Sequence, residues 1–259
     1  MINNFINAAT YEDICDFAII PDEGKLFLQE YINKNAIIFC KTDYIGYLFN
    51  CISNSDYKYN IITHHSDYSI DENVYSYTPK SVNKWFAINA VINKSNLIKI
   101  PLGIKTHKGI YKENHYDIPW FVENINFLKN KNKILDTVYC NWSNTNSYRN
   151  SIINNLKVKY KLETGFSFKE YCNNMSDYKF VLSPPGNGID CHRTWECLYM
   201  GCIPVVIKHK IYDNWIELPI LQVNNYSELN EELLNEFLQK EFNYNKLYLN
   251  YWKEKIKNI

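Results

Sequence analysis

The sequence has no excess of charge of either sign, because 28 Lys and Arg residues balance 28 Asp and Glu residues over 259 positions. Without a global positive field a protein is not drawn to nucleic acids or anionic membranes, so an anionic ligand needs a local site. No apolar run approaches the ~18 residues of a membrane-spanning helix. Residues 1–10 also lack the basic start and apolar block of a signal peptide. We therefore expect a soluble, cytoplasmic protein with no transmembrane segment and no nucleic-acid partner.

The motifs of several common enzyme classes are also missing. The sequence has no His-Glu-x-x-His, no Gly-x-x-x-x-Gly-Lys-[Ser/Thr] and no Gly-x-Ser-x-Gly, and no Gly-x-Gly-x-x-Gly follows a predicted strand. These absences argue against zinc metalloproteases, P-loop nucleotidases, α/β-hydrolases and NAD-dependent enzymes. The eight cysteines form no Cys-x-x-Cys pair, and most lie in apolar or helical patterns. We predict that they are buried thiols, neither disulfides nor zinc ligands.

The apolar residues that are present suffice for a large core, since 46% of the chain is hydrophobic and 22% is charged. Short apolar runs alternate with amphipathic stretches from end to end, which is typical of α/β proteins. Strands are predicted at residues 16–20, 36–41, 59–63, 84–88, 97–101, 137–141, 158–163, 179–183, 203–207 and 220–223. Helices are predicted at residues 24–33, 44–53, 89–94, 120–130, 148–156, 167–175, 190–200, 227–240 and 244–257.

The predicted elements divide into two consecutive α/β halves. We expect an α/β fold of two facing, Rossmann-like, doubly wound domains, one at residues 1–118 and one at 119–259, and the last helix could pack back toward the N-terminal domain. Ligands of open parallel sheets bind beyond the carboxyl ends of the strands. The sequences that follow Thr63, Asn141 and Ser183 are therefore the places to look for chemistry.

The stretch 179–207 combines a predicted strand, a glycine-containing loop, a helix, a tight turn and a second strand. Gly186 and Gly188 would let the backbone approach a ligand closely, and Asp190 is a candidate N-cap of the helix. Because the first N–H groups of a helix have no partner within it, this loop and helix predict an anion site.

The charged residues of the predicted helix strengthen this hypothesis. Arg193 adds a positive fork to the first turn, and Glu196 lies one turn later, ~5.4 Å further along the axis, on the same face as His192. This spacing suits a nucleoside diphosphate, with Arg193 on the diphosphate and Glu196 accepting from the ribose hydroxyls. The same three residues could equally form an ordinary surface ion-pair cluster.

This segment resembles the donor-binding segment of exostosin-like glycosyltransferases. The matching residues are Phe180, Leu182, Pro184, Gly186, Arg193, Glu196 and Gly201-Cys202-Ile203-Pro204-Val205. It is also similar, more loosely, to the corresponding segment of fucosyltransferases, which share the two-domain GT-B architecture. The resemblance implies a GT-B fold with an interdomain cleft, and a hexosyl- or pentosyltransferase that moves a sugar from a nucleotide-sugar donor to a glycan or another hydroxyl acceptor.

The resemblance also implies two sets of donor-binding residues. The first set is Ser183, Gly186, Asn187, Gly188, Asp190, His192, Arg193 and Glu196. The second set follows the predicted strand 137–141, where similar enzymes direct backbone amides and an arginine at the phosphates: Ser143, Thr145, Asn146 and Arg149. Any polar residue of that second loop could instead simply cap a helix.

Two histidines and an aspartate follow the predicted strand 59–63. His64, His65 and Asp67 are candidate catalytic residues that could position the acceptor hydroxyl or remove its proton, since histidine titrates near neutrality and burial can tune a carboxylate. A histidine–aspartate pair could equally be a structural hydrogen bond. Asp67 and His65 are the leading candidates for the general base, and the less favoured alternatives are Glu12, Asp22 and Asp43.

The predicted mechanism uses no metal and no cofactor beyond the nucleotide-sugar co-substrate. The sequence has no Asp-x-Asp, which argues against the metal-dependent GT-A class and favours charge stabilisation by Arg193 and Arg149. Many retaining GT-B enzymes have a glutamate eight positions before the ribose-binding one, but here Gly188 stands there, so we expect inversion. Exostosin-like enzymes usually carry a membrane anchor, whereas we expect none in this chain. The alternative function is a non-catalytic nucleotide- or glycan-binding module that is the partner of an active glycosyltransferase.

Overall fold

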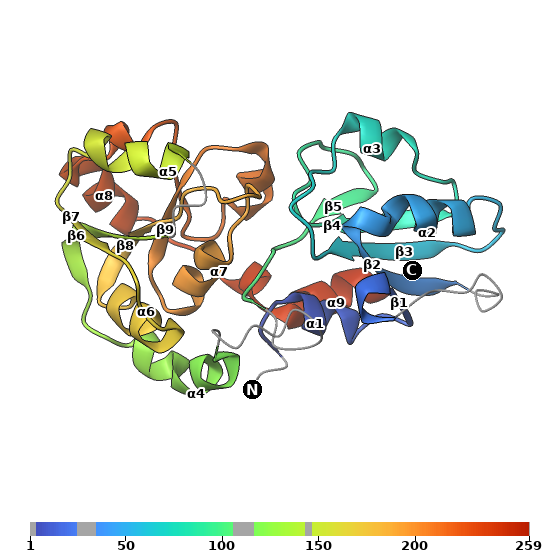
Figure 1. Ribbon diagram of the computed structural model, residues 1–259, viewed down its shortest axis with the longest axis horizontal. Helices are drawn as coiled ribbons and strands as arrows, with labels where there is room; N and C mark the ends of the chain where they lie inside the picture. Colours follow the sequence, from blue (N-terminus) through green and yellow to red (C-terminus); the bar gives the residue numbers. More distant parts are fainter. Residues whose placement is uncertain (1–3, 25–34, 106–116, 143–146, 259) are drawn as a thin grey trace. The chain divides into compact units, whose positions relative to one another are not determined.

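The structure is a computed structural model that describes residues 4–24, 35–105, 117–142 and 147–258. The described residues form two compact units (Figure 1). Residues 4–105 and 248–258 belong to the first unit, and residues 117–247 belong to the second. Each unit contains one five-stranded sheet in which all paired strands are parallel. The predicted α/β class is therefore confirmed.

The sheet of the first unit follows the order of the chain. Its strands, in spatial order, are β1 (Phe17–Ile19), β2 (Ala36–Lys41), β3 (Tyr59–His64), β4 (Val82–Ala87) and β5 (Leu97–Lys99). Right-handed crossovers that always step in one direction put their connections on one face of a sheet. Accordingly, α2 (Ile45–Ile52) and α3 (Glu72–Ser76) contribute to the same hydrophobic cluster, on the same face. This sheet has no reversal of strand order, so the expectation of a doubly wound sheet is wrong for the first unit.

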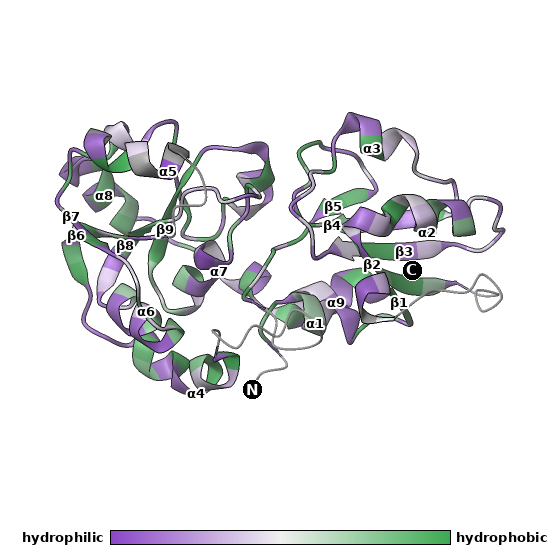
Figure 2. Cartoon of the chain, viewed as in Figure 1, coloured by the Kyte–Doolittle hydropathy of each residue, from purple (hydrophilic) through white to green (hydrophobic). Residues whose placement is uncertain are grey.

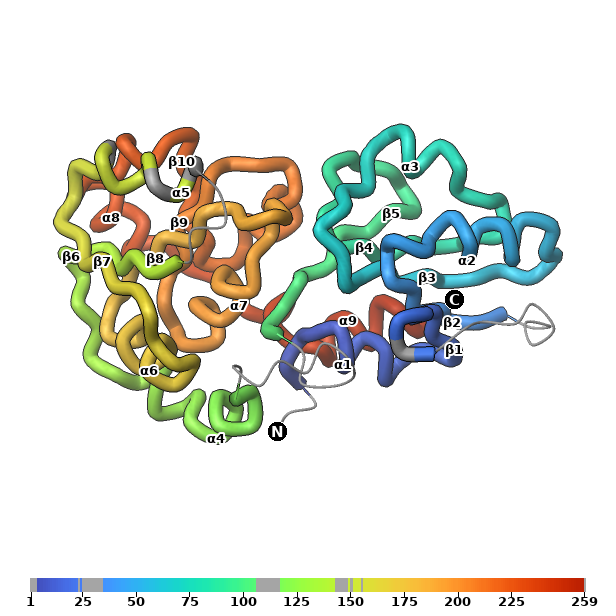
Figure 3. The backbone as a smooth tube through the Cα atoms, viewed as in Figure 1, coloured from blue at the N-terminus to red at the C-terminus, as the bar shows by residue number. Residues whose placement is uncertain are grey.

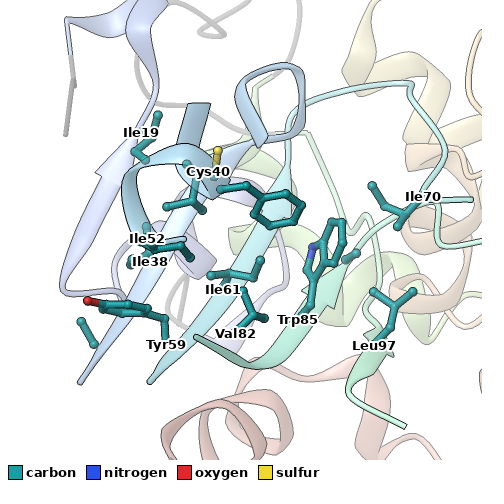
Figure 4. Close-up of a cluster of buried hydrophobic side chains, with 14 of the residues drawn as sticks. Ile19, Ile38, Cys40, Ile52, Tyr59, Ile61, Ile70, Val82, Trp85 and Leu97 are labelled. Atoms are coloured by element: carbon teal, nitrogen blue, oxygen red, sulfur yellow. The ribbon is translucent and has the colours of Figure 1, made fainter. Parts of the chain in front are cut away.

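Trp85 of β4 is the largest side chain in the cluster under α2 and α3 (Figure 4). It is fully buried, and Phe49 of α2 meets its ring edge-on at a centroid distance of 5.3 Å. The indole nitrogen, the one polar atom of this side chain, donates a hydrogen bond to Thr63 Oγ1 at 2.9 Å. The indole therefore anchors the core of the first unit, as expected for a buried tryptophan with a satisfied N–H.

The opposite face of the first sheet is covered by a helix from the other end of the chain. Asn60 alternates with the core residues of β3 and donates a hydrogen bond of 2.8 Å to the Ile256 carbonyl of α9 (Leu249–Lys257). Ile256 is fully buried, and Trp252 of the same helix is 3% exposed. Figure 3 follows the chain from the second unit back to this helix. Because the sequential strand order puts the connections on one face of the sheet, the other face is left for a helix from the end of the chain to cover.

We expect Ile256→Ala to lower the free energy of unfolding of the first unit by about 2–4 kcal/mol, because it leaves a cavity between α9 and the sheet. The control is Glu254→Ala, which removes an exposed side chain of the same helix and should change the free energy by less than about 0.5 kcal/mol. Urea denaturation of both variants measures the difference. Equal stability of the two variants would mean that α9 does not cover the sheet in solution.

The second sheet reverses its strand order. It runs β7 (Tyr160–Glu163), β6 (Ile134–Asn141), β8 (Tyr178–Leu182), β9 (Ile203–Ile207), β10 (Leu221–Val223). The first strand along the chain, β6, thus lies between the second and the third. Its connections use both faces, as Figure 1 shows: one face carries α5 and α8, and the other carries α6 and α7. The helices of this unit are α4 (Ile118–Lys129), α5 (Ser147–Ile152), α6 (Phe168–Met175), α7 (His192–Tyr199) and α8 (Glu231–Leu238). The expected doubly wound sheet is present here.

The remaining described elements are short. The first unit also contains α1 (Ala8–Glu12), which begins at a capping box between Asn7 and Thr10. Short 3-10 helices span Pro21–Glu23, Thr42–Tyr44, Ile153–Asn155, Lys210–Trp215, Tyr226–Glu228 and Asn245–Leu247. In Figure 2 the apolar residues concentrate in the strands, whereas the helices carry hydrophilic residues as well. Among the helices of the described residues, none combines the length and apolar character that crossing a membrane requires.

Two of the predicted helices have a different outcome. Most of the helix expected at residues 24–33 lies outside the described residues. The helix expected at residues 89–94 is wrong, because this segment pairs with the loop after β3 instead. Asn89 has a φ of +52°, and the Val91 N–H donates to the Ile70 carbonyl at 3.0 Å.

The eight cysteines are all free thiols in the structure, as predicted from the absence of paired spacings. Cys40, Cys140, Cys172, Cys197 and Cys202 are buried, and the other three are half-buried. Burial raises the pKa of the Cys202 thiol to about 11, against the opposing effect of Lys133.

Candidate functional site

The reversal of strand order in the second sheet marks a candidate ligand site. In doubly wound sheets, ligands bind outside the carboxyl ends of the strands where the order reverses. Here that point lies between β6 and β8, so it is bordered by Asn141 at the end of β6 and by the loop 183–191 after β8. Both segments were predicted to carry donor-binding residues.

The chain has only two arginines among its 28 basic residues, and both lie at this point. Arg149 is on α5 and Arg193 is in the first turn of α7. Arg149 is 5% exposed. Burial lowers the pKa of Arg149, and the neighbouring positive charge of Arg193 lowers it further. Two like charges held together in a partly buried place indicate that the site is built for an anion.

Arg149 holds the loop after β8 in place. Its Nε donates to the Pro185 carbonyl at 3.0 Å, and its Nη2 donates to the Pro184 carbonyl at 3.2 Å. A Cβ added at Gly186 would lie 3.2 Å from Arg149 Nη2. The glycine that was expected to let a ligand approach the backbone therefore makes room for the chain's own arginine.

Arg193 has a buried nitrogen that no described residue satisfies. Its Nε is inaccessible to solvent and has no hydrogen-bond partner among the residues that the structure describes. Burial opposes the charge of Arg193, but neighbouring groups that include Glu196 favour it, and the net effect raises the pKa of the guanidinium. Arg193 therefore stays a cation. A buried, charged N–H without a partner is costly, so this position is suited to an acceptor that comes from a ligand.

Glu196 lies one helical turn after Arg193, as the spacing predicted, and its electrostatic influence reaches Arg193. The side chain is 2% exposed, and its Oε2 accepts a hydrogen bond of 3.0 Å from Tyr171 Oη. Tyr171 comes from α6 and was not predicted to be part of the site. Glu196 is therefore part of a buried polar contact between two helices, not of an exposed ion-pair cluster.

Asp190 does not cap α7, contrary to the prediction. The helix begins at His192, and the preceding N-cap residue, Cys191, makes no side-chain capping bond. The Asp190 carboxylate instead accepts the Trp195 indole N–H at 2.9 and 3.0 Å, and also the Cys191 backbone N–H at 2.9 Å. Asp190 therefore fixes the loop onto the helix and is not available to cap it.

We expect Asp190→Ala to lower the free energy of unfolding of the second unit by about 2–3 kcal/mol, because it leaves the buried Trp195 N–H without an acceptor. The control, Asp213→Ala, removes an exposed carboxylate from the same unit and should have little effect. Tryptophan fluorescence during urea denaturation measures both variants. A wild-type stability for Asp190→Ala would contradict this structural role.

The remaining predicted residues of the loop differ in their surroundings. Ser183 is buried, and its hydroxyl lies 2.9 Å from Thr194 Oγ1, so it joins β8 to α7. Gly188 is buried and accepts the Gly186 N–H at 3.0 Å. Asn187 is exposed, and His192 is half-buried at the start of α7. Asn187 is thus the exposed residue of this loop, and His192 is partly accessible at the start of α7.

The other predicted donor-binding residues cannot be placed. Ser143, Thr145 and Asn146 lie outside the described residues. Trp142, which precedes them, is 6% exposed and belongs to the hydrophobic cluster under α5 and α8.

The predicted catalytic residues lie at the carboxyl end of β3, in the first unit. The Nδ1 of His64 accepts the His65 backbone N–H at 2.8 Å, so the proton of the neutral ring is on Nε2, which lies 3.1 Å from the Leu102 carbonyl. His64 is 1% exposed. Both ring nitrogens are thus engaged within the first unit, which makes His64 a structural residue and disfavours it as the base.

His65 and Asp67 have more open surroundings than His64. His65 is half-buried with a φ of +61°, and its ring meets Phe39 edge-on at a centroid distance of 5.8 Å. Asp67 is exposed. Among the described residues, Asp67 makes no hydrogen bond to either histidine, so the alternative of a structural histidine–aspartate pair is not supported.

The rarity of arginine in the sequence also points to this site. In a chain with 26 lysines, two arginines stand out, and both prove to be at one site. No comparable signal distinguishes Tyr171 among 22 tyrosines.

In the described part of the chain, no group of three or more His, Cys, Asp or Glu side chains is arranged to hold a metal ion. Comparison with models of protein families and with curated proteins finds no match to this sequence.

Proposed function

We propose that the chain is a glycosyltransferase of GT-B architecture, similar to the exostosin-like enzymes, and that its second unit binds the nucleotide-sugar donor. The observation that carries the proposal is the buried Arg193 Nε, which has no partner among the described residues, next to a second arginine at the reversal point of a doubly wound sheet. A diphosphate supplies the acceptors that this site lacks. The donor-segment resemblance of residues 179–207 supports the same ligand.

The chemistry of sugar transfer fits two fixed cations. As the acceptor oxygen bonds to the anomeric carbon, the bond from that carbon to the diphosphate breaks, and negative charge grows on the leaving group. A preorganised positive charge stabilises that growth at no cost in reorganisation. Arg193 contacts the diphosphate directly in this proposal, and Arg149 keeps the loop 183–191 in place while its charge adds to the local field. The site thus supplies from side chains the charge that metal-dependent transferases take from an ion.

Glu196 accepts hydrogen bonds from the ribose in this proposal, and the base that activates the acceptor comes from the first unit. Asp67 and His65 remain the candidates for that base, because His64 already uses both ring nitrogens. Direct displacement by the activated acceptor inverts the configuration at the anomeric carbon. The accessible Asn187 and His192 extend the donor site beside the loop.

A binding-only module is the second candidate function. The observation that favours it is the hydrogen bonding of His64. Because both of its ring nitrogens have partners, only two of the three candidate catalytic residues remain. In that case the arginine site would hold a nucleotide, or a glycan carrying an anionic group, without turnover.

Release of nucleoside diphosphate from nucleotide sugars tests the proposal. The protein is incubated in EDTA with UDP-, GDP-, CDP- and dTDP-sugars, with and without hydroxyl acceptors. We expect slow release from one donor class, and we expect Arg193→Ala to abolish it. Saturable binding without release would support the binding-only module. If the protein neither binds any of these donors nor releases diphosphate from one, the glycosyltransferase is contradicted, and a binding-only module could hold only a glycan.

A further inference from the structure

The hydroxyl of Tyr171 donates a hydrogen bond to one oxygen of the Glu196 carboxylate. Its Oη lies 3.0 Å from Glu196 Oε2 and reaches it from α6, outside the helix that carries Glu196. A glutamate side chain has several rotamers, and burial alone does not choose among them. A hydrogen bond from a neighbouring rigid element does choose, because it fixes one carboxylate oxygen in space.

Tyr171 is well suited to act as a permanent donor. Burial raises the pKa of Tyr171 well above its ordinary value, and the nearby carboxylate of Glu196 raises it further. The phenol therefore keeps its proton at all physiological pH values. Its helix is held at its start by a capping box in which Ser167 and Glu170 satisfy each other's backbone N–H groups. The donor atom thus sits on a short, well-anchored element.

We propose that Tyr171 is a positioning residue that directs Glu196 toward the 2′- and 3′-hydroxyls of a ribonucleoside diphosphate and thereby sets the preference of the site for ribose over 2′-deoxyribose. This inference rests on the proposed function, since it requires a nucleotide whose diphosphate is bound by Arg193. A buried carboxylate aimed at a diol rejects a ligand that lacks one hydroxyl, because the acceptor is then left without a partner. A carboxylate free to rotate can turn away and tolerates the missing hydroxyl.

Isothermal titration of the full chain with UDP, GDP and their 2′-deoxy forms tests the inference. We expect the wild type to bind the ribose form of its preferred nucleotide at least about tenfold more tightly than the deoxy form. In Tyr171→Phe, which keeps the aromatic ring, the ratio should fall to about threefold or less, while the affinity for the deoxy nucleotide changes by less than about twofold. A loss of affinity that is equal for both forms would mean a merely structural role and would overturn the inference.

The matched control is Tyr199→Phe. Tyr199 is a buried tyrosine of α7 whose hydroxyl donates to the Leu247 carbonyl at 2.6 Å, not to Glu196, so its removal should leave the preference for ribose unchanged. Glu196→Gln should remove the preference, and adding Tyr171→Phe to it should cause no further loss, as expected when two residues act through one interaction.

The outcomes separate this inference from the proposed function. If the wild type prefers the ribose form and Tyr171→Phe keeps that preference, the inference is wrong and the nucleotide site stands. If Glu196→Gln keeps the preference, Glu196 does not contact the diol and the inference is likewise wrong. If the wild type binds none of these four nucleotides and neither CDP nor dTDP, the proposed function fails, and the inference fails with it.

Discussion

Arg193→Lys is expected to weaken the binding of nucleoside diphosphates by about 30-fold or more, which corresponds to about 2 kcal/mol. The substitution keeps one positive charge, but it removes the planar fork and the buried Nε, for which the described part of the chain offers no partner. Lysine cannot replace the two parallel hydrogen bonds that arginine makes to a diphosphate. Because the substitution leaves the net charge unchanged, the loss of affinity would come from the lost hydrogen bonds. Isothermal titration with the preferred nucleotide measures it.

The control for this prediction removes a positive charge from the other end of the same sheet. Lys159 precedes β7 and forms an exposed ion pair of 3.4 Å with Asp136. Lys159→Ala should therefore leave nucleotide affinity within about twofold of the wild type. If Arg193→Lys binds as tightly as the wild type, or if both variants lose affinity equally, the assignment of the diphosphate to Arg193 is wrong.

Gly103→Ala is expected to destabilise the first unit by about 4 kcal/mol or more, which is enough to unfold many domains of this size. A Cβ at this position would lie 2.0 Å from the Ile6 carbonyl oxygen and 2.5 Å from its carbon. The Ile104 N–H donates to the same carbonyl at 2.9 Å, so the backbone cannot move aside without breaking that bond. Gly103 also has a φ of +71°, which any residue with a Cβ adopts only under strain.

Gly46→Ala is the matched control for this second prediction. Gly46 lies in α2, and an added Cβ would meet no atom within 4 Å. Alanine favours a helix more than glycine does, so this variant should be as stable as the wild type or more stable by up to about 1 kcal/mol. Hydrogen exchange of β3 and urea denaturation compare the two. Equal protection of β3 in both variants would show that residue 103 does not lie against Ile6.

The strands were the part of the fold most open to prediction from sequence. The predicted bounds of β2 and β9 agree with Ala36–Lys41 and Ile203–Ile207, because each is a continuous apolar run between polar residues. The segment 89–94 was mispredicted because its pairing with Ile70 is a tertiary contact, and local propensity carries no information about it. Strand order within each sheet is set by such long-range contacts as well. The sequential order of the first sheet was therefore not predictable. The last helix was expected to pack back toward the N-terminal domain, but the sheet face that α9 covers could not be read from the sequence.

The site was predictable only along one helix. Arg193 and Glu196 were placed together because helical periodicity is a local property. The approach of Arg149 to the Pro184 and Pro185 carbonyls joins residues 35 and 36 positions apart, and the contact of Tyr171 with Glu196 spans 25 positions. Periodicity cannot show either contact. Asp190 was mispredicted for the same reason. Its position before the helix suggested an N-cap, but its carboxylate accepts the Trp195 indole N–H instead.

Binding of a nucleoside diphosphate at the two arginines can be measured directly, because the chain has no other arginine. Protein labelled with ¹⁵N only in arginine has just two Nε–H groups, those of Arg149 and Arg193, and Arg193→Lys assigns their NMR signals. On titration with UDP, GDP, CDP or dTDP in EDTA, the account predicts that the Arg193 signal shifts saturably with at least one nucleotide as its Nε gains a partner. Two signals that stay unmoved at millimolar concentrations of all four nucleotides would contradict the account.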